Sequence, residues 1–200
     1  MPGRRAPGRA PLARAVTDAV AHETSYEIIF VEDGPTDCTA KRLTALKGEI
    51  AHFRPLRHDR NLGQSRGIHT GIEAAKGEII VTLDGDGQND PADIPKLLAE
   101  RARAAADVKL FAGWRVHRQD SGSKRWASTL ANAIRARMLH DATPDTGCGI
   151  KLFERDAFLD LPHFNHMHRY LPALMQRAGW KTLSVPVNHR HRTAGVSKYN

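Results

Sequence analysis

Short apolar runs alternate with amphipathic stretches along most of the chain. Runs of strand length, rich in Ile, Val and Phe, predict strands at 26–33, 78–84, 107–115 and 182–190. Apolar residues that recur every three or four positions predict helices within 60–77, which begins as a loop, and at 90–106, 123–140 and 167–178. Residues 147–161 are expected to form a further short strand and helix.

This alternation predicts a single α/β domain with a mostly parallel sheet and helices on both faces. In the helix within 60–77, Ile68, Ile72 and Ala75 share one face. Asp90 and Pro91 open the helix at 90–106 as an N-cap and a first-turn proline. Ligands of such sheets bind at the carboxyl ends of the strands.

Acidic side chains follow two of the predicted strands. The strand at 26–33 ends in Glu32 and Asp33, and the strand at 78–84 delivers the chain into Asp84 and Asp86. Oxygen ligands of this kind suit Mg²⁺ or Mn²⁺, which usually takes one or two protein carboxylates and completes its shell with substrate phosphates. The sequence therefore predicts a divalent cation site at the strand end, with Asp90 left to cap its helix.

Composition and charge narrow the function classes. The chain has 200 residues, 40% of them hydrophobic and 26% charged, which is typical of a globular domain. The net charge of +8 is concentrated in residues 109–140 and 169–200, each +6, which leaves −4 for the rest. These two segments predict a surface for an anionic partner, with a merely solvated basic surface as the alternative.

Cysteines and histidines give weaker signals. The two cysteines lie far apart and form no disulfide or metal framework, which favours a reducing, cytoplasmic setting. The spacing of the later histidines fits no closed zinc site, so we interpret them as surface or phosphate-facing groups. They are His163, His166, His168, His189 and His191.

Five segments in order carry a family resemblance. They read "VEDGPTDCT", "NLGQSRGIHTGIEAAKGEIIVTLDGDGQNDP", "DTGCGIKLF", "HRYLPAL" and "HRTAGVSKYN". Together they resemble the family 2 glycosyltransferases of GT-A (Rossmann-like) fold, and most closely their polyprenyl-phosphate branch, typified by dolichol-phosphate mannosyltransferase and undecaprenyl-phosphate relatives. The resemblance implies transfer of a sugar, with mannose as the first expectation, from GDP-mannose or a UDP-sugar to dolichyl or undecaprenyl phosphate.

The resemblance also implies roles for single residues. Glu32, Asp33 and Asp37 match positions that contact the nucleotide, although Glu32 replaces the usual Asp and Pro35 the usual Ser. Asp86 and Gln88 match positions that hold Mg²⁺ or Mn²⁺ with the donor diphosphate, and Asp84 lies beside them. Basic residues match positions that face donor or acceptor phosphates. These are Arg115, Arg125, Arg169, Arg192 and Lys198. Asp84, Asp86, Arg169 and Lys198 form the expected catalytic set.

The implied reaction needs no strong general base. A phosphate acceptor, with a second pKa of about 6, is already largely ionised at neutral pH. Arg and Lys side chains, with the cation, are expected to neutralise the departing diphosphate, which predicts single displacement with inversion. The basic helix at 123–140 and the C-terminal segment are expected to face an anionic membrane surface on its cytoplasmic side.

The chain departs from the family at both ends. Residues 1–10 lack β-formers and predict a disordered basic leader where the first family strand would stand, so residues 11–200 are expected to form a truncated domain. A fragment, a mis-started reading frame and a catalytically impaired copy remain alternatives. So do a sugar nucleotidyltransferase, which lacks its early glycine-rich phosphate loop here, and a nucleic-acid-binding module, which the 6% aromatic content disfavours.

Overall fold

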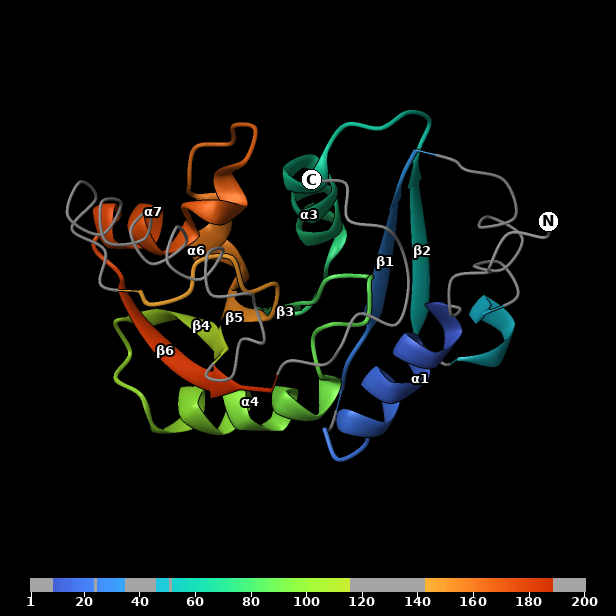
Figure 1. Cartoon of the computed structure of the whole chain (residues 1–200), viewed down its shortest axis with the longest axis horizontal. Coiled ribbons are helices and arrows are strands. Elements are labelled where there is room, and N and C mark those ends of the chain that lie inside the picture. Colours follow the sequence, from blue (N-terminus) through green and yellow to red (C-terminus); the bar gives the residue numbers. More distant parts are fainter. Residues whose placement is uncertain (1–8, 24, 35–45, 51, 116–142, 189–200) are drawn as a thin grey trace, which may run out of the picture.

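The computed structural model describes residues 9–23, 25–34, 46–50, 52–115 and 143–188. Strands and helices alternate along them, as Figure 1 shows. The first half contains α1 (Arg9–Ala19), β1 (Ile28–Asp33), β2 (Phe53–His58), α3 (Gln64–Ala74) and β3 (Ile79–Thr82). The second half contains η1 (Pro91–Asp93), α4 (Ile94–Arg103), β4 (Val108–Arg115), β5 (Lys151–Glu154), α6 (Arg155–Leu159), η2 (Met167–Arg169), α7 (Leu171–Arg177) and β6 (Lys181–Val187).

The strands form two sheets. Strands β1 and β2 pair in parallel, and a four-stranded sheet has the order β3-β5-β4-β6. In the larger sheet β4 and β6 are parallel, whereas β5 runs against both β3 and β4. The predicted α/β class is confirmed, and β5 is the strand of this sheet that departs from a parallel arrangement.

The break between the sheets lies between β1 and β3. None of the residues that the structure describes forms a strand there. Residues of β3 are only half-buried, whereas β5 and the centre of β4 are buried. Helix α3 spans the break, because Gly71 packs against Val31 of β1 while Ile72 joins the core cluster of the larger sheet.

The predicted elements that lie within the described residues are largely confirmed. The helix predicted at 90–106 begins as the 3₁₀ turn η1, and Asp90 caps it by accepting a 3.0 Å hydrogen bond from the Ala92 amide. The sequence analysis missed β2, "FRPLRH", because its charged residues and Pro55 hide the strand pattern. The helix predicted at 123–140 lies outside the described residues, and α1 begins at Arg9.

The core consists of residues that the apolar runs supplied. One cluster joins Leu97 of α4 to Phe111, Ile150 and Leu152 of the larger sheet. A second, on the other face, joins Leu110 and Phe153 to Ile72, Phe158 and Met175. None of the helices in the described part of the chain has the length and apolar character needed to cross a bilayer.

Candidate active site

Polar and charged side chains gather where β1 to β4 end and where the antiparallel β5 begins. We call this region the carboxyl ends. The residues concerned are Glu32, Asp33, His58, Asp84, Arg115, Asp145 and Lys151. Among the described residues that carry predicted roles, Asp84, Asp86 and Gln88 follow β3, and Arg169 lies apart from the strands in η2.

Asp84 is held from three sides. Its Oδ1 accepts a 2.9 Å hydrogen bond from Nε2 of Gln64 in the first turn of α3. Its backbone amide donates to Oδ1 of Asn89 at 2.9 Å. A Cβ atom on Gly149 would lie 2.1 Å from Asp84 Oδ2, so this carboxylate position requires glycine at 149. Gln64 and the space at Gly149 thus fix the carboxylate, while Asn89 holds the backbone of the same residue.

The charges around Asp84 are buried and of both signs. Burial raises the pKa of Asp84, and the neighbouring Asp86 raises it further, while Lys151 and Arg115 act in the opposite direction. Lys151 is itself buried, which lowers its pKa, and its ammonium donates to the Cys148 carbonyl oxygen. The raised pKa of Asp84 shows that the two carboxylates repel one another in a poorly solvated place.

A divalent cation fits this arrangement. The described residues contain no cluster of three or more His, Cys, Asp or Glu that could hold a metal alone. Two neighbouring carboxylates are nevertheless the set that Mg²⁺ or Mn²⁺ uses when phosphates complete its shell. Asp86 Oδ1 accepts the Gln88 amide at 3.0 Å, and Gly87 has a φ of 77°, so the loop turns back tightly beside Asp84.

Asp33 braces the loop before α3. Its Oδ1 and Oδ2 accept 2.7 Å hydrogen bonds from the Leu62 and Gly63 amides respectively, and His58 Nδ1 lies 2.9 Å from Oδ1. Burial alone would raise the pKa of Asp33, but these hydrogen bonds lower it. The predicted nucleotide contact of Asp33 stays a prediction, since much of its hydrogen-bonding capacity already serves the loop.

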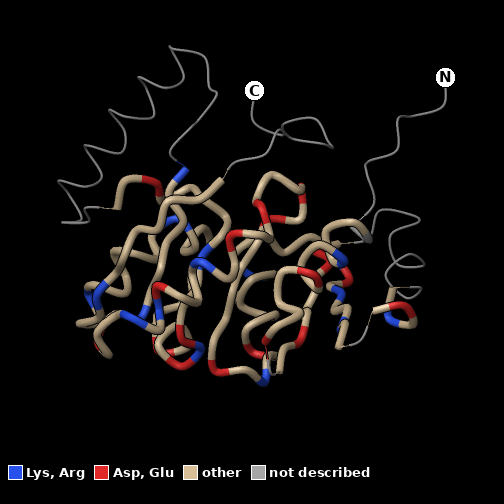
Figure 2. Tube along the Cα trace, turned by 90° about the horizontal axis from the view of Figure 1, so that it is seen from below, with Lys and Arg blue, Asp and Glu red and all other residues tan. Residues whose placement is uncertain are grey.

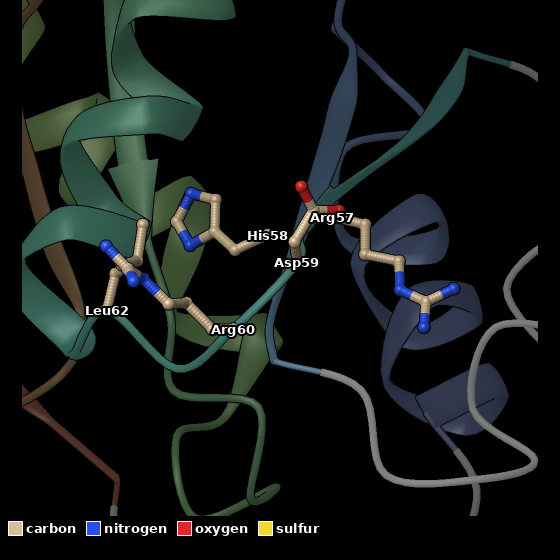
Figure 3. Close-up of a pocket in the computed structure, with 5 residues that line it drawn as sticks. All are labelled: Arg57, His58, Asp59, Arg60 and Leu62. Carbon is tan, nitrogen blue, oxygen red and sulfur yellow. The ribbon is translucent and has the colours of Figure 1, made fainter.

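A pocket of about 500 Å³ opens beside this brace. In Figure 3, His58, Arg60 and Leu62 lie on one side of the end of β2, and Arg57 points to the other side. Glu32 of β1 is 3% exposed, and its Oε2 lies 3.9 Å from Nε of the lining residue Arg57. Strand β2 therefore supplies lining residues that the sequence analysis did not predict.

Arg115 is paired within the protein. Its Nε and Nη2 donate to the two carboxylate oxygens of the buried Asp145 at 2.6 and 2.8 Å. A bidentate pair of this kind fixes the guanidinium plane. Its predicted contact with a phosphate stays a prediction. Lys109, the other described cation of the basic segment at 109–140, is paired with Glu154 at 2.6 Å.

Arg169 lies in η2, beside a histidine that contacts α3. His168 Nδ1 is hydrogen-bonded to Ser65 Oγ at 2.7 Å. Burial and the nearby Lys151 and Arg169 lower the pKa of His168 to about 4, so its ring is neutral at pH 7. Figure 1 shows the segment between α6 and α7, which contains η2, beside α3.

The structure thus brings together Asp84, Asp86 and Gln88, with Arg115 near enough to affect the pKa of Asp84. Four predicted residues lie outside the described ones: Asp37, Arg125, Arg192 and Lys198. Acidic and basic residues are interspersed along the described chain (Figure 2). His168, which we expected to be a surface or phosphate-facing group, is half-buried and hydrogen-bonded to Ser65. The residues that the sequence analysis missed are Gln64, Ser65, Asn89, Asp145, Gly149 and Lys151. A lysine inside the apolar run "GIKLF" was the one available signal among them.

Comparison with known sequences finds one family model and relatives with related names. The model of the family described as glycosyl transferase family 2 matches residues 7–161. A dodecaprenyl-phosphate galacturonate synthase from Rhizobium johnstonii is 34% identical over 200 residues, covering 94% of this chain and 57% of that protein. An undecaprenyl-phosphate 4-deoxy-4-formamido-L-arabinose transferase from Sodalis glossinidius is 33% identical, with the same coverage of 94% and 57%. The chain therefore spans little more than half the length of these relatives.

Solved structures share the fold. Glucosyl-3-phosphoglycerate synthase from Mycobacterium tuberculosis, in complex with Mg²⁺ and UDP, superposes with a TM-score of 0.67 at 18% identity. The superposition covers 92% of this chain and 67% of that one. The complex of the same enzyme with Mn²⁺ and UDP-glucose gives a TM-score of 0.66 at 19% identity, covering 94% and 68%. The predicted GT-A fold is confirmed by this likeness, which at such identity extends to the fold alone.

Proposed function

Because the chain belongs to glycosyl transferase family 2, we propose that it transfers a sugar from a nucleoside diphosphate donor to a polyprenyl phosphate, with inversion at the anomeric carbon. Two relatives at 33–34% identity are named for polyprenyl-phosphate acceptors, which supports this acceptor class. The proposal includes work at the cytoplasmic face of a membrane, where such an acceptor presents its phosphate.

The observation that carries the proposal is the cradle around Asp84. Gln64 binds the carboxylate of Asp84, the Asn89 side chain accepts from its backbone amide, and the space left by Gly149 admits the carboxylate. Holding a buried carboxylate against like charge is unfavourable for folding, and strain of this kind is typical of a binding site. The arrangement supports binding of a cationic partner at this strand end.

The residues of the chain would divide the work as follows. Asp84 and Asp86, with Gln88 in the same loop, would hold Mg²⁺ or Mn²⁺, whose positive charge would stabilise the departing diphosphate. Asp33 keeps the loop before α3 in place through the Leu62 and Gly63 amides, so that Gln64 reaches Asp84. The acceptor phosphate is already ionised at neutral pH, so the reaction requires no protein base.

The sugar is the least supported part of the expectation. Mannose finds no support among these relatives, which are named for galacturonate and 4-deoxy-4-formamido-L-arabinose. We therefore propose a uronic acid or a modified pentose as the first sugars to test, as UDP derivatives, with GDP-mannose beside them. A donor that is bound but never transferred would instead favour the catalytically impaired relative.

Thermal unfolding with a panel of nucleotide sugars, with and without Mn²⁺, tests the proposal. We expect one donor to raise the melting temperature only with the metal, and Asp86→Ala to lose that rise. Asp156→Ala is the matched control, because its side chain is 91% exposed at the start of α6. Folded protein that responds to no donor would contradict the proposal.

Transfer itself is measured with a short-chain polyprenyl phosphate and the donor that shifts the melting temperature. Formation of a sugar phosphate lipid confirms the reaction. Release of pyrophosphate, when the panel is supplied with sugar phosphates and nucleoside triphosphates, would favour the nucleotidyltransferase alternative instead.

A further inference from the structure

Three large hydrophobic side chains are exposed around the entrance to α3. Leu62, in the loop that Asp33 braces, is 41% exposed. Phe164 and Tyr170, in the segment between α6 and α7, are 41% and 40% exposed, and their ring centroids lie 6.3 Å apart. Isolated exposed hydrophobic residues are common, but a pair of rings that remain exposed side by side is less so.

The two segments lie against one another. Ser65 Oγ is hydrogen-bonded to His168 Nδ1 at 2.7 Å, and a Cβ atom on Gly63 would lie 3.6 Å from Asn165 Oδ1. Gln64, between these two contacts, reaches Asp84. The exposed hydrophobic side chains therefore border the candidate active site and do not lie on a remote face.

The same segments are basic. Residues 60–66 and 162–170 contain no Asp or Glu. They contribute Arg60, Arg66 and Arg169, all exposed. Glu73 of α3, whose side chain is half exposed and whose Oε2 lies 3.1 Å from His69 Nδ1, lies in neither segment. We call these exposed residues the aromatic rim: Leu62, Phe164, Tyr170, Arg60, Arg66 and Arg169.

We propose that the aromatic rim docks on an anionic bilayer surface and so brings the site to the headgroups. This inference rests on the proposed function, in which the acceptor phosphate lies in a membrane. Aromatic rings are favoured at the boundary between headgroups and acyl chains, and arginine stems bury their methylenes while their charges contact phosphates. Each nearby cation adds attraction to an anionic leaflet, so the rim combines both components of interfacial binding.

Vesicle flotation tests the docking. Wild-type protein is mixed with vesicles of phosphatidylcholine alone, or of phosphatidylcholine and phosphatidylglycerol in equal parts, at low and high salt. We expect binding to the anionic vesicles that weakens with salt. Phe164→Ser combined with Tyr170→Ser should lower the partition coefficient on the order of tenfold, because two rings lose their interfacial burial. Leu183→Ser, at a position 36% exposed in β6, is the matched control and should bind as wild type does.

Insertion of the rim is measured separately. Phe164→Trp should gain fluorescence that is blue-shifted by anionic vesicles and quenched by brominated lipid, whereas Leu183→Trp should show neither change. Equal binding by the Phe164/Tyr170 double variant and wild type, or equal quenching of the two tryptophans, would overturn the proposal. So would a wild-type protein that ignores anionic vesicles.

Failure of this inference and failure of the proposed function are distinguishable. The donor-dependent rise in melting temperature uses no lipid, and we expect the double variant to retain it. A retained donor response with unchanged vesicle binding refutes the docking surface alone. Lost donor response in wild-type protein refutes the proposed function, whatever the vesicles show.

Discussion

The two ends of the strands are built for different purposes. At the amino ends, charges are paired in the folded protein: Arg54 with Glu27 at 2.5 Å, Lys109 with Glu154 at 2.6 Å, and Lys181 with Asp107 at 2.7 Å. At the carboxyl ends, Asp84 and Asp86 repel one another, and burial raises the pKa of Asp84. The carboxyl ends also contain a paired cation, Arg115 with Asp145, but they keep the repulsion between Asp84 and Asp86 that the proposed metal ion would relieve.

Glycines at the two ends of the strands differ in how closely other atoms surround them. Near the amino end of β3, a Cβ atom on Gly77 would lie 3.7 Å from the nearest atom, an ordinary contact. Near the carboxyl end, a Cβ atom on Gly149 would overlap the Asp84 carboxylate and lie 2.6 Å from Asn89 Oδ1. The position of the Asp84 carboxylate thus restricts residue 149 to glycine, whereas Gly77 is under no such restriction.

The largest expected effect comes from removing the repulsion itself. Asp86→Ala should lower the transfer rate by about two to three orders of magnitude, since a group that stabilises developing charge is lost. The same variant should be at least as stable as wild type without ligands, because the like charge beside Asp84 is gone. Steady-state transfer and urea unfolding measure the two quantities, and a variant that loses both activity and stability would contradict the comparison.

Gly149→Ala should damage the cradle next most severely. Its added methyl group cannot share space with the Asp84 carboxylate, so we expect a loss of kcat/KM of at least about tenfold and destabilisation of about 1–3 kcal/mol. Gly147→Ala is the control, because its Cβ would meet Arg115 Nη2 only at 3.4 Å. Similar losses in both variants would show that the loop as a whole, and not the contact with Asp84, is sensitive.

Acid sensitivity should be traceable to His168. Its pKa of about 4 lies below the ordinary 6.5, so the unfolded chain binds more protons than the folded one between these values. Stability should therefore fall as the pH decreases from above 6.5 to 4, and His168→Asn should reduce that fall. Urea unfolding across this pH range measures it, with His166→Asn, at an exposed position of φ 66°, as the control.

The smallest effect is expected at the amino ends. Glu27 accepts hydrogen bonds from the Lys76 amide at 2.6 Å and from Arg54, so Glu27→Gln should cost about 1 kcal/mol of stability. Transfer activity at a temperature where the variant is folded should equal that of wild type. A clear loss of activity would show that the two ends of the strands are coupled, and would remove the distinction drawn between them.

The sequence predicted much of the fold and the position of two acids beyond the end of β3. Apolar runs identified β1, β3, β4 and β6, because buried strands need such runs whatever they pair with. Asp84 and Asp86 were recognised because two carboxylates at a strand end have no place in a core. Asp90 was assigned correctly to capping, since the Asp-Pro pair at a helix start is a local signal.

What the sequence could not predict depends on residues far apart in the chain. Strand β2 forms despite Pro55 because it pairs with β1 over six residues. Its own sequence pattern does not suggest a strand. The apolar β3 is only half-buried, because no described strand covers the edge that faces β1. The burial of a strand thus depends on the elements that pack beside it, and an apolar run alone does not identify them.

The amino-acid sequence by itself determined the strand and helix order, the helix cap and the acidic strand ends, because each of these depends on residues that are close together in the chain. Only the tertiary structure decided how the acids are held. Pairing of Thr82 with Lys151 brings Gly149 against Asp84 and buries a lysine beneath the carboxylates, and packing of α3 brings Gln64 to the same atom. Contacts of this kind join residues 20 to 69 positions apart, and no local pattern encodes them.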